Sequence, residues 1–598
     1  RLVETGIDPK QIEAAINEVE FSLREANYGG LSKGLIYSFP IMQNWLYDSD
    51  PFANLRFNPL LDELKKKSKK DYFENLIKTA LLDNKHTSII TLLPRRGMET
   101  DREEELRKYL AEYKKSLSQS ELEELVAETQ NLINVQMQPD SKESLETIPV
   151  LTLEDVNKKA EIIPQEIEKS EKVTYLYHPI FTSGIIYQSI LFDVRSIAPE
   201  DIPYLELLSS VLGKVSTRNF SYTELDSEIG IHLGGLSVDL SCISSSDEIF
   251  PKIRISSKAL YAKTAKMREL TEEIIHTSKF DDKQRITEII QRIKSGMEMA
   301  IISSGLGIVR IMSYISEQGR YQELISGISY YKFIKDLENN IDSRFPELVD
   351  KLVDLQKKVF NTKNLIFSIT AEREQHDVIR NEMNKFTATL SNENQSMVSP
   401  ALPAPEITKE GFYTPVQTQF VSKGGNFRNH GIEYSGSMSV LTSILNLDYF
   451  WSNVRVKGGA YGCYSGITRQ GTVIFSSYRD PNLSKSLNVF DASGEFVRDF
   501  TADEREMRKI IIGTISRYDK VLTPSMKGGL MTVRYMLGIT QEDIQKVRNE
   551  VLSTKVSDIN NLGEMLDLVM QENKICVFGN ESAIKSEKDI FDRIVNGV

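Results

Sequence analysis

An arginine and a tyrosine, Arg455 and Tyr461, stand six residues apart in the segment of this 598-residue chain that is best equipped to act on a peptide. A guanidinium can grip a backbone carbonyl or a carboxylate with its fork of N–H groups. A phenol hydroxyl is a suitable donor to the oxyanion that forms during amide hydrolysis. Gly458 and Gly459 lie between the two, and glycine lets an extended peptide pass close to the backbone. The same residues are also compatible with a surface ion pair of Arg455 and with Tyr461 buried in a core around a glycine turn.

Other residue types that carry out hydrolysis are not grouped in this sequence. A zinc site needs three converging ligands, and no two of the six histidines stand within five residues of each other: His86, His178, His232, His276, His376 and His430. His376 has the most acidic neighbours, but the pattern around it is typical of a charged helix surface. The sequence contains neither the H-x-x-E-H zinc motif nor the G-x-S-x-G serine motif, and its glycine pairs lack the Lys-Ser/Thr of a phosphate loop. We therefore predict no metal site within this chain.

The elements that must position Arg455 and Tyr461 belong to a repeated pattern. An apolar run with helical character, residues 435–454, comes before them, and a β-rich segment, residues 471–478, comes after. At three places a helix that begins after an aspartate is followed roughly seventy to eighty residues later by a short apolar strand, a spacing too long for a solenoid unit of ~20–50 residues. Chance similarity of common helix–strand pairs is the alternative. The three pairs are Asp8 with 86–94, Asp282 with 364–370, and Asp503 with 574–579.

β-rich material precedes the helix in the second and third copies only, which predicts an α+β chain with two complete domains and the second half of another. Between the first two copies, leucines at helical spacing over residues 103–117 and 121–133 predict an antiparallel helical hairpin; a stray surface hairpin is the alternative. A segment rich in Ser, Asn and Pro, residues 391–405, separates the last two domains. The predicted boundaries are 1–98 for the half domain, 99–140 for the hairpin, 141–390 and 412–598 for the complete domains, and 391–411 for the linker.

This layout, together with two short motifs, resembles the pitrilysin/insulinase-type zinc peptidases (inverzincins) in their presequence-protease and falcilysin branch. The motifs are residues 455–462 and, in the first copy, Phe21-Ser-Leu-Arg-Glu25 with Asn27, Gly29 and Gly30. The resemblance implies four peptidase-like domains in two halves that a long helical hairpin joins. The first domain of such an enzyme carries the H-x-x-E-H helix, so the chain would be a C-terminal portion without it. At the corresponding place in the second copy, residues 201–211, leucines and serines replace the ligands, which implies a catalytically dead domain.

The function that the resemblance implies is zinc-dependent cleavage of short unfolded peptides, such as targeting sequences or proteolysis fragments, in an enclosed chamber. Arg455 would hold the peptide backbone beside the scissile bond, and Tyr461 would donate to the carbonyl or its tetrahedral intermediate. Zinc would be bound outside this chain, by an N-terminal catalytic portion on the same or another polypeptide, and the isolated chain would be inactive. The alternative is a non-catalytic peptide-binding or assembly subunit related to these peptidases.

Composition excludes some partners and compartments. A net charge of −12 with 26% charged residues disfavours a nucleic-acid binder, which would show a basic face. No apolar run approaches the ~18 residues of a membrane span, so no membrane partner is predicted. The three cysteines lie far apart without a disulfide framework, which favours a reducing intracellular location, either a bacterial cytoplasm or a mitochondrial matrix. A start at Arg1 without a charged-then-apolar leader is expected of a fragment.

Overall fold

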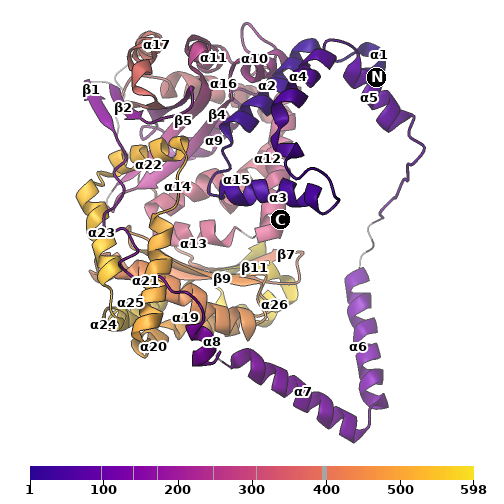
Figure 1. Ribbon diagram of the computed structural model, residues 1–598, viewed down its shortest axis with the longest axis vertical. Helices are drawn as coiled ribbons and strands as arrows, with labels where there is room; N and C mark the ends of the chain where they lie inside the picture. Colours follow the sequence, from indigo (N-terminus) through magenta and orange to yellow (C-terminus); the bar gives the residue numbers. More distant parts are fainter. Residues whose placement is uncertain are drawn as a thin grey trace. The chain divides into compact units, whose positions relative to one another are not determined.

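The computed structural model describes residues 1–93, 95, 97–138, 140–170, 173–246, 248–304, 306–392 and 401–597. The chain forms two compact units, one of Arg1–Gly6 with Asp71–Thr152, and one of Ile7–Lys70 with Leu153–Val598. The smaller unit is helical, and the larger one holds two six-stranded sheets (Figure 1). The central part of the predicted linker, residues 393–400, lies outside the described residues.

Two long helices dominate the smaller unit, α6 (Met98–Ser116) and α7 (Gln119–Met137). Ser118 begins α7 with a capping box, because its hydroxyl accepts from the Glu121 N–H while the Glu121 carboxylate accepts from the Ser118 N–H. Both helices are confirmed, but they diverge from the corner between them (Figure 1), so the predicted antiparallel packing is not formed. Leu106 and Leu110 of α6 are exposed, so they do not supply the packed interface that would hold a hairpin closed.

Residues 86–93 do not form the strand predicted at 86–94, and Pro94 lies outside the described residues. Their apolar side chains face solvent: Ile89 is 91% exposed and Leu92 is 90% exposed. A strand needs a neighbour to pair its N–H and C=O groups, and the described residues of this unit contain no other strand. The prediction was wrong for this reason, since the sequence pattern reports the apolar run but not whether a partner strand is present.

The first sheet of the larger unit has the order β1-β2-β6-β3-β5-β4, antiparallel throughout except for the parallel pair β2–β6. Helices including α9 (Ile202–Val211), α11 (Thr264–Thr277) and α16 (Ile341–Val359) bury one face of it, around a core that contains Ile190, Leu208 and Phe367. The strand predicted at 364–370 is β6. The strands are β1 (Glu166–Lys169), β2 (Val173–Pro179), β3 (Ile185–Asp193), β4 (Gly235–Ser244), β5 (Ile249–Leu260) and β6 (Leu365–Ala371).

The second sheet repeats this arrangement with the order β12-β7-β11-β8-β10-β9. Its helical face is covered by elements that include α18 (Ser437–Ile444), α21 (Glu504–Tyr518) and α25 (Gly563–Gln571). The strands predicted at 471–478 and 574–579 are confirmed as β10 and β11, and the α+β class is confirmed. The strands are β7 (Lys409–Thr414), β8 (Phe420–Asn426), β9 (Gly462–Ile467), β10 (Thr472–Tyr478), β11 (Lys574–Asn580) and β12 (Arg593–Asn596).

The two sheets exchange helices across their other faces. Helix α13 (Gly307–Ile315), which follows the first sheet's helices, packs Ile311 against Phe578 of the second sheet. Helix α22 (Pro524–Leu537), which belongs to the second module, lies on the first sheet, where Gly528 comes so close that a Cβ would stand 1.9 Å from the Thr370 hydroxyl. Each module therefore completes the burial of the other, and the pair behaves as one packed body.

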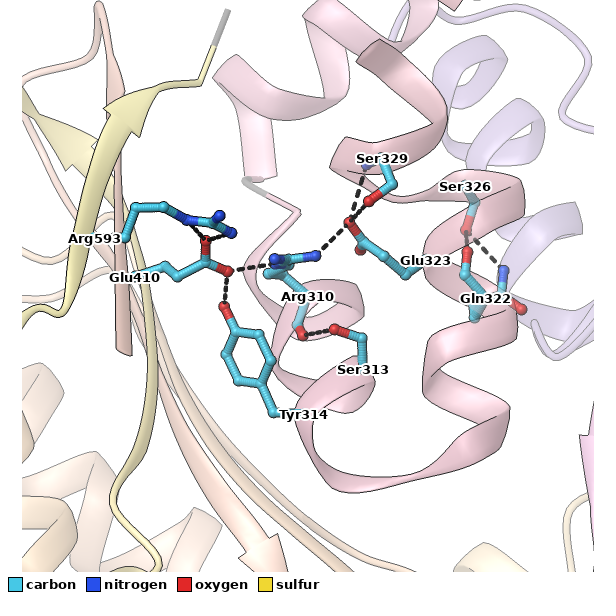
Figure 2. Close-up of polar contacts among 9 residues, drawn as sticks. All are labelled: Arg310, Ser313, Tyr314, Gln322, Glu323, Ser326, Ser329, Glu410 and Arg593. Carbon is cyan, nitrogen blue, oxygen red and sulfur yellow. Dashed lines mark hydrogen bonds and ion pairs between the residues drawn. The ribbon is translucent and has the colours of Figure 1, made fainter. Parts of the chain in front are cut away.

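A buried ionic network fixes the same junction (Figure 2). The carboxylate of Glu410 on β7 accepts from the Arg310 Nε (2.6 Å), from the Arg593 Nε (2.7 Å) and from the Tyr314 hydroxyl. Arg310 also donates to Glu323 at 3.1 Å, so the network runs from β12 and β7 through α13 to α14 (Glu317–Ser326). Two guanidiniums face two carboxyl groups, and each charge depends on its partners because all but Arg593 are buried.

His178 on β2 is buried beneath α22, with its Nε2 3.3 Å from the Ser368 hydroxyl. Burial lowers the pKa of His178 from 6.5 to about 4. As the pH falls through this window, the unfolded chain takes up a proton that the folded chain refuses, so the free energy of unfolding should fall by on the order of 3 kcal/mol. We expect His178→Asn to remove this part of the pH dependence in urea unfolding between pH 7 and pH 4. The exposed His86→Asn is the control, and equal pH profiles for both variants would contradict the assignment.

No helix among the described residues is by itself long and apolar enough to cross a bilayer; one pair bent by 90°, Lys283–Ser303 with Gly307–Ile315, passes the length and composition test only when the two are joined.

Candidate functional site

Arg455 lies at the end of a helical run that is anchored in the core of the second module. Helix α18 continues into two π-helical stretches, Leu445–Tyr449 and Trp451–Val456, which confirms the helix predicted over 435–454. Phe450 and Val454 point into the core and are buried. Arg455 is exposed, because it follows Val454 directly and so points to a different side of the helix.

The two glycines turn the chain from this helix into the sheet. Gly459 adopts φ +78°, and its N–H donates to the Arg455 carbonyl at 2.9 Å, a left-handed helix end that glycine accepts most readily. A Cβ on Gly458 would lie 2.4 Å from the Val454 carbonyl oxygen, so a larger residue would not fit there. The Tyr461 N–H then donates to the Tyr478 carbonyl at 3.1 Å, which starts the pairing of β9 with β10.

This turn brings the two predicted side chains together. The Arg455 guanidinium stacks 4.0 Å above the Trp451 ring and lies 5.9 Å from the centre of the Tyr461 ring. Tyr461 is 67% exposed and rests edge-on against Tyr478, with ring centres 5.7 Å apart. Within the described part of the chain, Arg455 forms no ion pair and the Tyr461 hydroxyl forms no hydrogen bond. The alternative of a surface ion pair beside a core tyrosine is therefore wrong, while the catalytic role stays a prediction.

Three neighbours of this pair escaped the sequence analysis. Trp451 carries the guanidinium by a cation–π contact, and its place four residues before Arg455 on a helix could have indicated it. Tyr464 is exposed on β9 beside Tyr461. Asn446 accepts from the Ser465 N–H (2.7 Å) and donates to its carbonyl (3.1 Å), which caps the edge of β9 as a neighbouring strand would. No local pattern predicts this last contact.

The cysteines do not supply a nucleophile at this place. Cys463 opens β9 next to the pair, and burial raises the pKa of its thiol well above the usual range. The thiolate is the reactive form of cysteine, so Cys463 is a small strand residue, as its sequence context predicted. Burial also raises the pKa of Cys242 to about 12 and that of Cys576 further.

Comparison with known proteins decides the family. Residues 92–337 match the family described as peptidase M16 (subfamily C) associated, and residues 409–581 match the PreP C-terminal domain. The chain is 38% identical over 598 residues to Protein HypA of Clostridium perfringens, which covers 99% of this chain and 61% of that protein. It is 30% identical over 600 residues to presequence protease 1, chloroplastic/mitochondrial, of Arabidopsis thaliana, which covers 99% of this chain and 55% of that protein. The chain belongs to the presequence-protease-like branch of the pitrilysin-type M16 peptidases.

Solved structures show the same fold. A conserved protein from Enterococcus faecalis aligns with a TM-score of 0.54 at 14% identity, over 70% of this chain and 99% of its own. The peptidase M16 inactive domain from Pseudomonas fluorescens aligns with a TM-score of 0.52 at 14% identity, over 70% of this chain and 98% of its own. The chain spans about three fifths or less of the curated relatives, 61% of the Clostridium protein and 55% of the Arabidopsis one.

Peptidases of the M16 family are zinc-dependent, and α9 is the helix of this chain expected at the position of a zinc helix. Its buried positions hold Leu205, Leu208 and Ser209, none of them a zinc ligand of the family. Its one carboxyl group, Glu206, is kept protonated because burial, with a smaller effect of Asp239, raises its pKa to about 8. Zinc needs three deprotonated ligands, so α9 does not fit the metal.

The histidines of the chain do not assemble a metal site elsewhere in the part that the structure describes. His376 lies on the surface of α17 (His376–Ala388), with its Nδ1 3.1 Å from Asp377 and its Nε2 3.6 Å from Glu168. Its ring also meets Tyr177 edge-on at 4.7 Å. Among the described residues, no group of three His, Cys, Asp or Glu side chains could hold a metal ion.

Proposed function

We propose that this chain is the C-terminal portion of a zinc metalloendopeptidase that degrades short unfolded peptides, either targeting sequences or proteolysis fragments, in an enclosed chamber. The chain supplies chamber wall and substrate contacts, while the zinc and its ligands belong to an N-terminal catalytic portion. The observation that carries the proposal is the pair of Arg455 and Tyr461, which stand together on an exposed surface, with no ion pair or hydroxyl hydrogen bond to any described residue. Arg455 grips the peptide backbone, and Tyr461 donates to the carbonyl or its tetrahedral intermediate.

An uncovered apolar face on α3 (Lys33–Trp45) supports a missing partner. Leu35, Phe39, Met42 and Trp45 follow helical spacing along one side, with Phe39 63% and Trp45 64% exposed, and no residue of this helix is buried. Monomeric proteins rarely expose continuous apolar surface of this kind. The proposed occupant is the catalytic portion that would complete the half domain 1–98, whether it is part of the same polypeptide or a separate one. The proposed location is intracellular, in a bacterial cytoplasm or a mitochondrial matrix.

The test combines this chain with the part of the Clostridium relative that the chain does not cover. We expect the isolated chain to leave a quenched fluorescent unstructured peptide intact and to contain no stoichiometric zinc. The assembled pair should cleave the peptide and lose this activity when a chelator removes the metal. If the two parts assemble but never cleave, the second candidate, a non-catalytic peptide-binding or assembly subunit, takes the place of the enzyme; the absence of zinc ligands on α9 is what favours it.

The face of α3 gives a prediction of its own. Phe39→Asp should weaken association with the catalytic portion by roughly tenfold or more, because burying a phenylalanine contributes about 1.5–3 kcal/mol. The variant should melt like the wild type, since Phe39 is already exposed in the chain alone. Association can be followed by titration calorimetry. Val521→Asp, on an exposed residue of the other module, is the matched control, and an equal affinity for both variants would assign the partner surface elsewhere.

A further inference from the structure

Serine side chains form a row across four neighbouring strands of the first sheet. Ser237 on β4 faces Ser256 on β5, Ser256 faces Ser189 on β3, and Ser189 faces Ser368 on β6. Because strands lie about 4.8 Å apart, the hydroxyls are spaced evenly at right angles to the strands. The Ser189 and Ser256 oxygens are 3.4 Å apart. The row lies on the face opposite the hydrophobic core, since Ile190 and Ile255, the next residues on β3 and β5, are core residues.

Longer side chains border this row on both sides. Two positions along each strand, Tyr187 and Lys258 stand on one side, and Arg254 with Asp239 stands on the other. Lys258 pairs with Glu25, and the Arg254 Nε lies 3.2 Å from both Asp239 oxygens. The serines are therefore the floor of a trough whose walls carry charges that cancel.

The sequence motif at Phe21 and Glu25 builds one of these walls. Phe21 packs so closely on the backbone of Gly234 that a Cβ there would meet its ring at 2.3 Å, and the Lys258 Nζ lies 5.3 Å from the centre of the same ring. Glu25, at the end of α2 (Pro9–Glu25), is nearly buried and holds Lys258 in place. The motif thus shapes the trough by fixing a cation that would otherwise reach across it.

Helix α22 closes the trough at one end. Its Thr532 hydroxyl donates to the Ser368 hydroxyl at 2.6 Å, and Ser525, Gly528 and Gly529 line the space above the serines. The volume of the trough is about 450 Å³, within the ~300–1,000 Å³ range of ligand pockets. Exposure decreases along the row, from the exposed Ser237 to the buried Ser368, so the trough is open at the β4 edge and ends under the helix.

The lining selects one class of ligand. Hydroxyl groups both donate and accept, which matches the alternating N–H and C=O groups of an extended peptide. The compensated charges do not demand an ion, and the described lining offers a bulky aliphatic side chain only at Leu236. We propose that the trough over Ser237, Ser256 and Ser189 binds an extended segment of polypeptide through its backbone, as a second peptide site on a different sheet from Arg455 and Tyr461. The proposal rests on the proposed function in one respect, the unfolded peptide as substrate.

Peptide binding to the 598-residue chain tests the trough without any turnover. The probe is a short fluorescein-labelled peptide of Ala, Ser, Leu and Arg with blocked termini, followed by fluorescence anisotropy. Ser256→Tyr places a ring in the middle of the floor and should weaken binding by roughly tenfold or more. Ser557→Tyr, on an exposed helix position of the other module, is the matched control and should bind like the wild type.

A second measurement does not depend on the folding of the Ser256 variant. Ser237→Cys carrying a benzophenone should cross-link the peptide on irradiation, and Ser557→Cys with the same label should not, because position 237 is the exposed mouth of the trough. Equal cross-linking at both positions, unchanged affinity of a folded Ser256→Tyr, or no binding by the wild type would overturn the trough. Each of these results leaves the peptidase proposal standing if the assembled protein cleaves peptides, whereas an assembled protein that binds at the trough and never cleaves rejects the peptidase alone.

Discussion

Tyr461→Phe is expected to lower the turnover of the assembled peptidase by roughly 10²-fold or more, the effect of removing one donor from an oxyanion. The phenol is 67% exposed and its ring is held by the edge of Tyr478. Phenylalanine keeps this ring contact and loses only the hydroxyl, so the substitution isolates the donor. A donor that acts on the transition state lowers kcat and kcat/KM together, with KM little changed. Steady-state kinetics on a short quenched peptide measures both.

Tyr464→Phe is the matched control for this substitution. Tyr464 is also an exposed tyrosine of the same edge, three residues further along the chain, and its variant should turn over like the wild type. Arg455→Ala should also lose roughly 10²-fold, but with a rise in KM, because the guanidinium grips the ground-state backbone as well. Unchanged kinetics for Tyr461→Phe would refute its role as donor and leave Tyr461 as a surface residue beside Trp451.

Local chemistry made the helices and the glycine turn predictable. The aspartates Asp8, Asp282 and Asp503 all lie directly before helices, α2, α12 (Lys283–Ser304) and α21, since a side-chain carboxylate there satisfies free N–H groups. The helical run before Arg455 and the turn at Gly458 depend on neighbours within a few residues. What this reasoning could not provide is the exposure of Tyr461, which depends on the pairing of β9 with β10.

Contacts between distant segments were outside the reach of the pattern. The strand at 364–370 finds β2 and β3 as neighbours, whereas the equally apolar residues 86–93 find none among the described residues, and nothing within either segment distinguishes them. The serine row is likewise a matter of register. Ser189, Ser256 and Ser368 lie on three separate strands, and they face each other only because the strands align in this register.

The same limit applies to the ionic network at the junction of the two modules, where Glu410 lies about a hundred residues from Arg310 and further from Arg593 (Figure 2). Burial raises the pKa of Glu410, but its bonds to Arg310, Tyr314 and Arg593 lower the pKa by more, so the carboxyl group titrates below its usual range. The stabilisation by this carboxylate is thus present above the usual carboxyl pKa and is lost as the pH falls through the lower folded value.

Glu410→Gln should therefore lower the free energy of unfolding by about 3–5 kcal/mol near pH 7, because breaking a buried ion pair leaves its partners uncompensated. Tyr314→Phe removes one donor and keeps both charges, so it should cost less, about 1.5–3 kcal/mol. Urea unfolding at pH 7 and pH 4 measures both, and the difference between wild type and Glu410→Gln should shrink at the lower pH. Asp342→Asn, in the exposed pair with Lys283, is the control and should have no measurable effect. If Glu410→Gln unfolds like this control, the network does not hold the modules together, and the exchanged helices α13 and α22 alone must account for their packing.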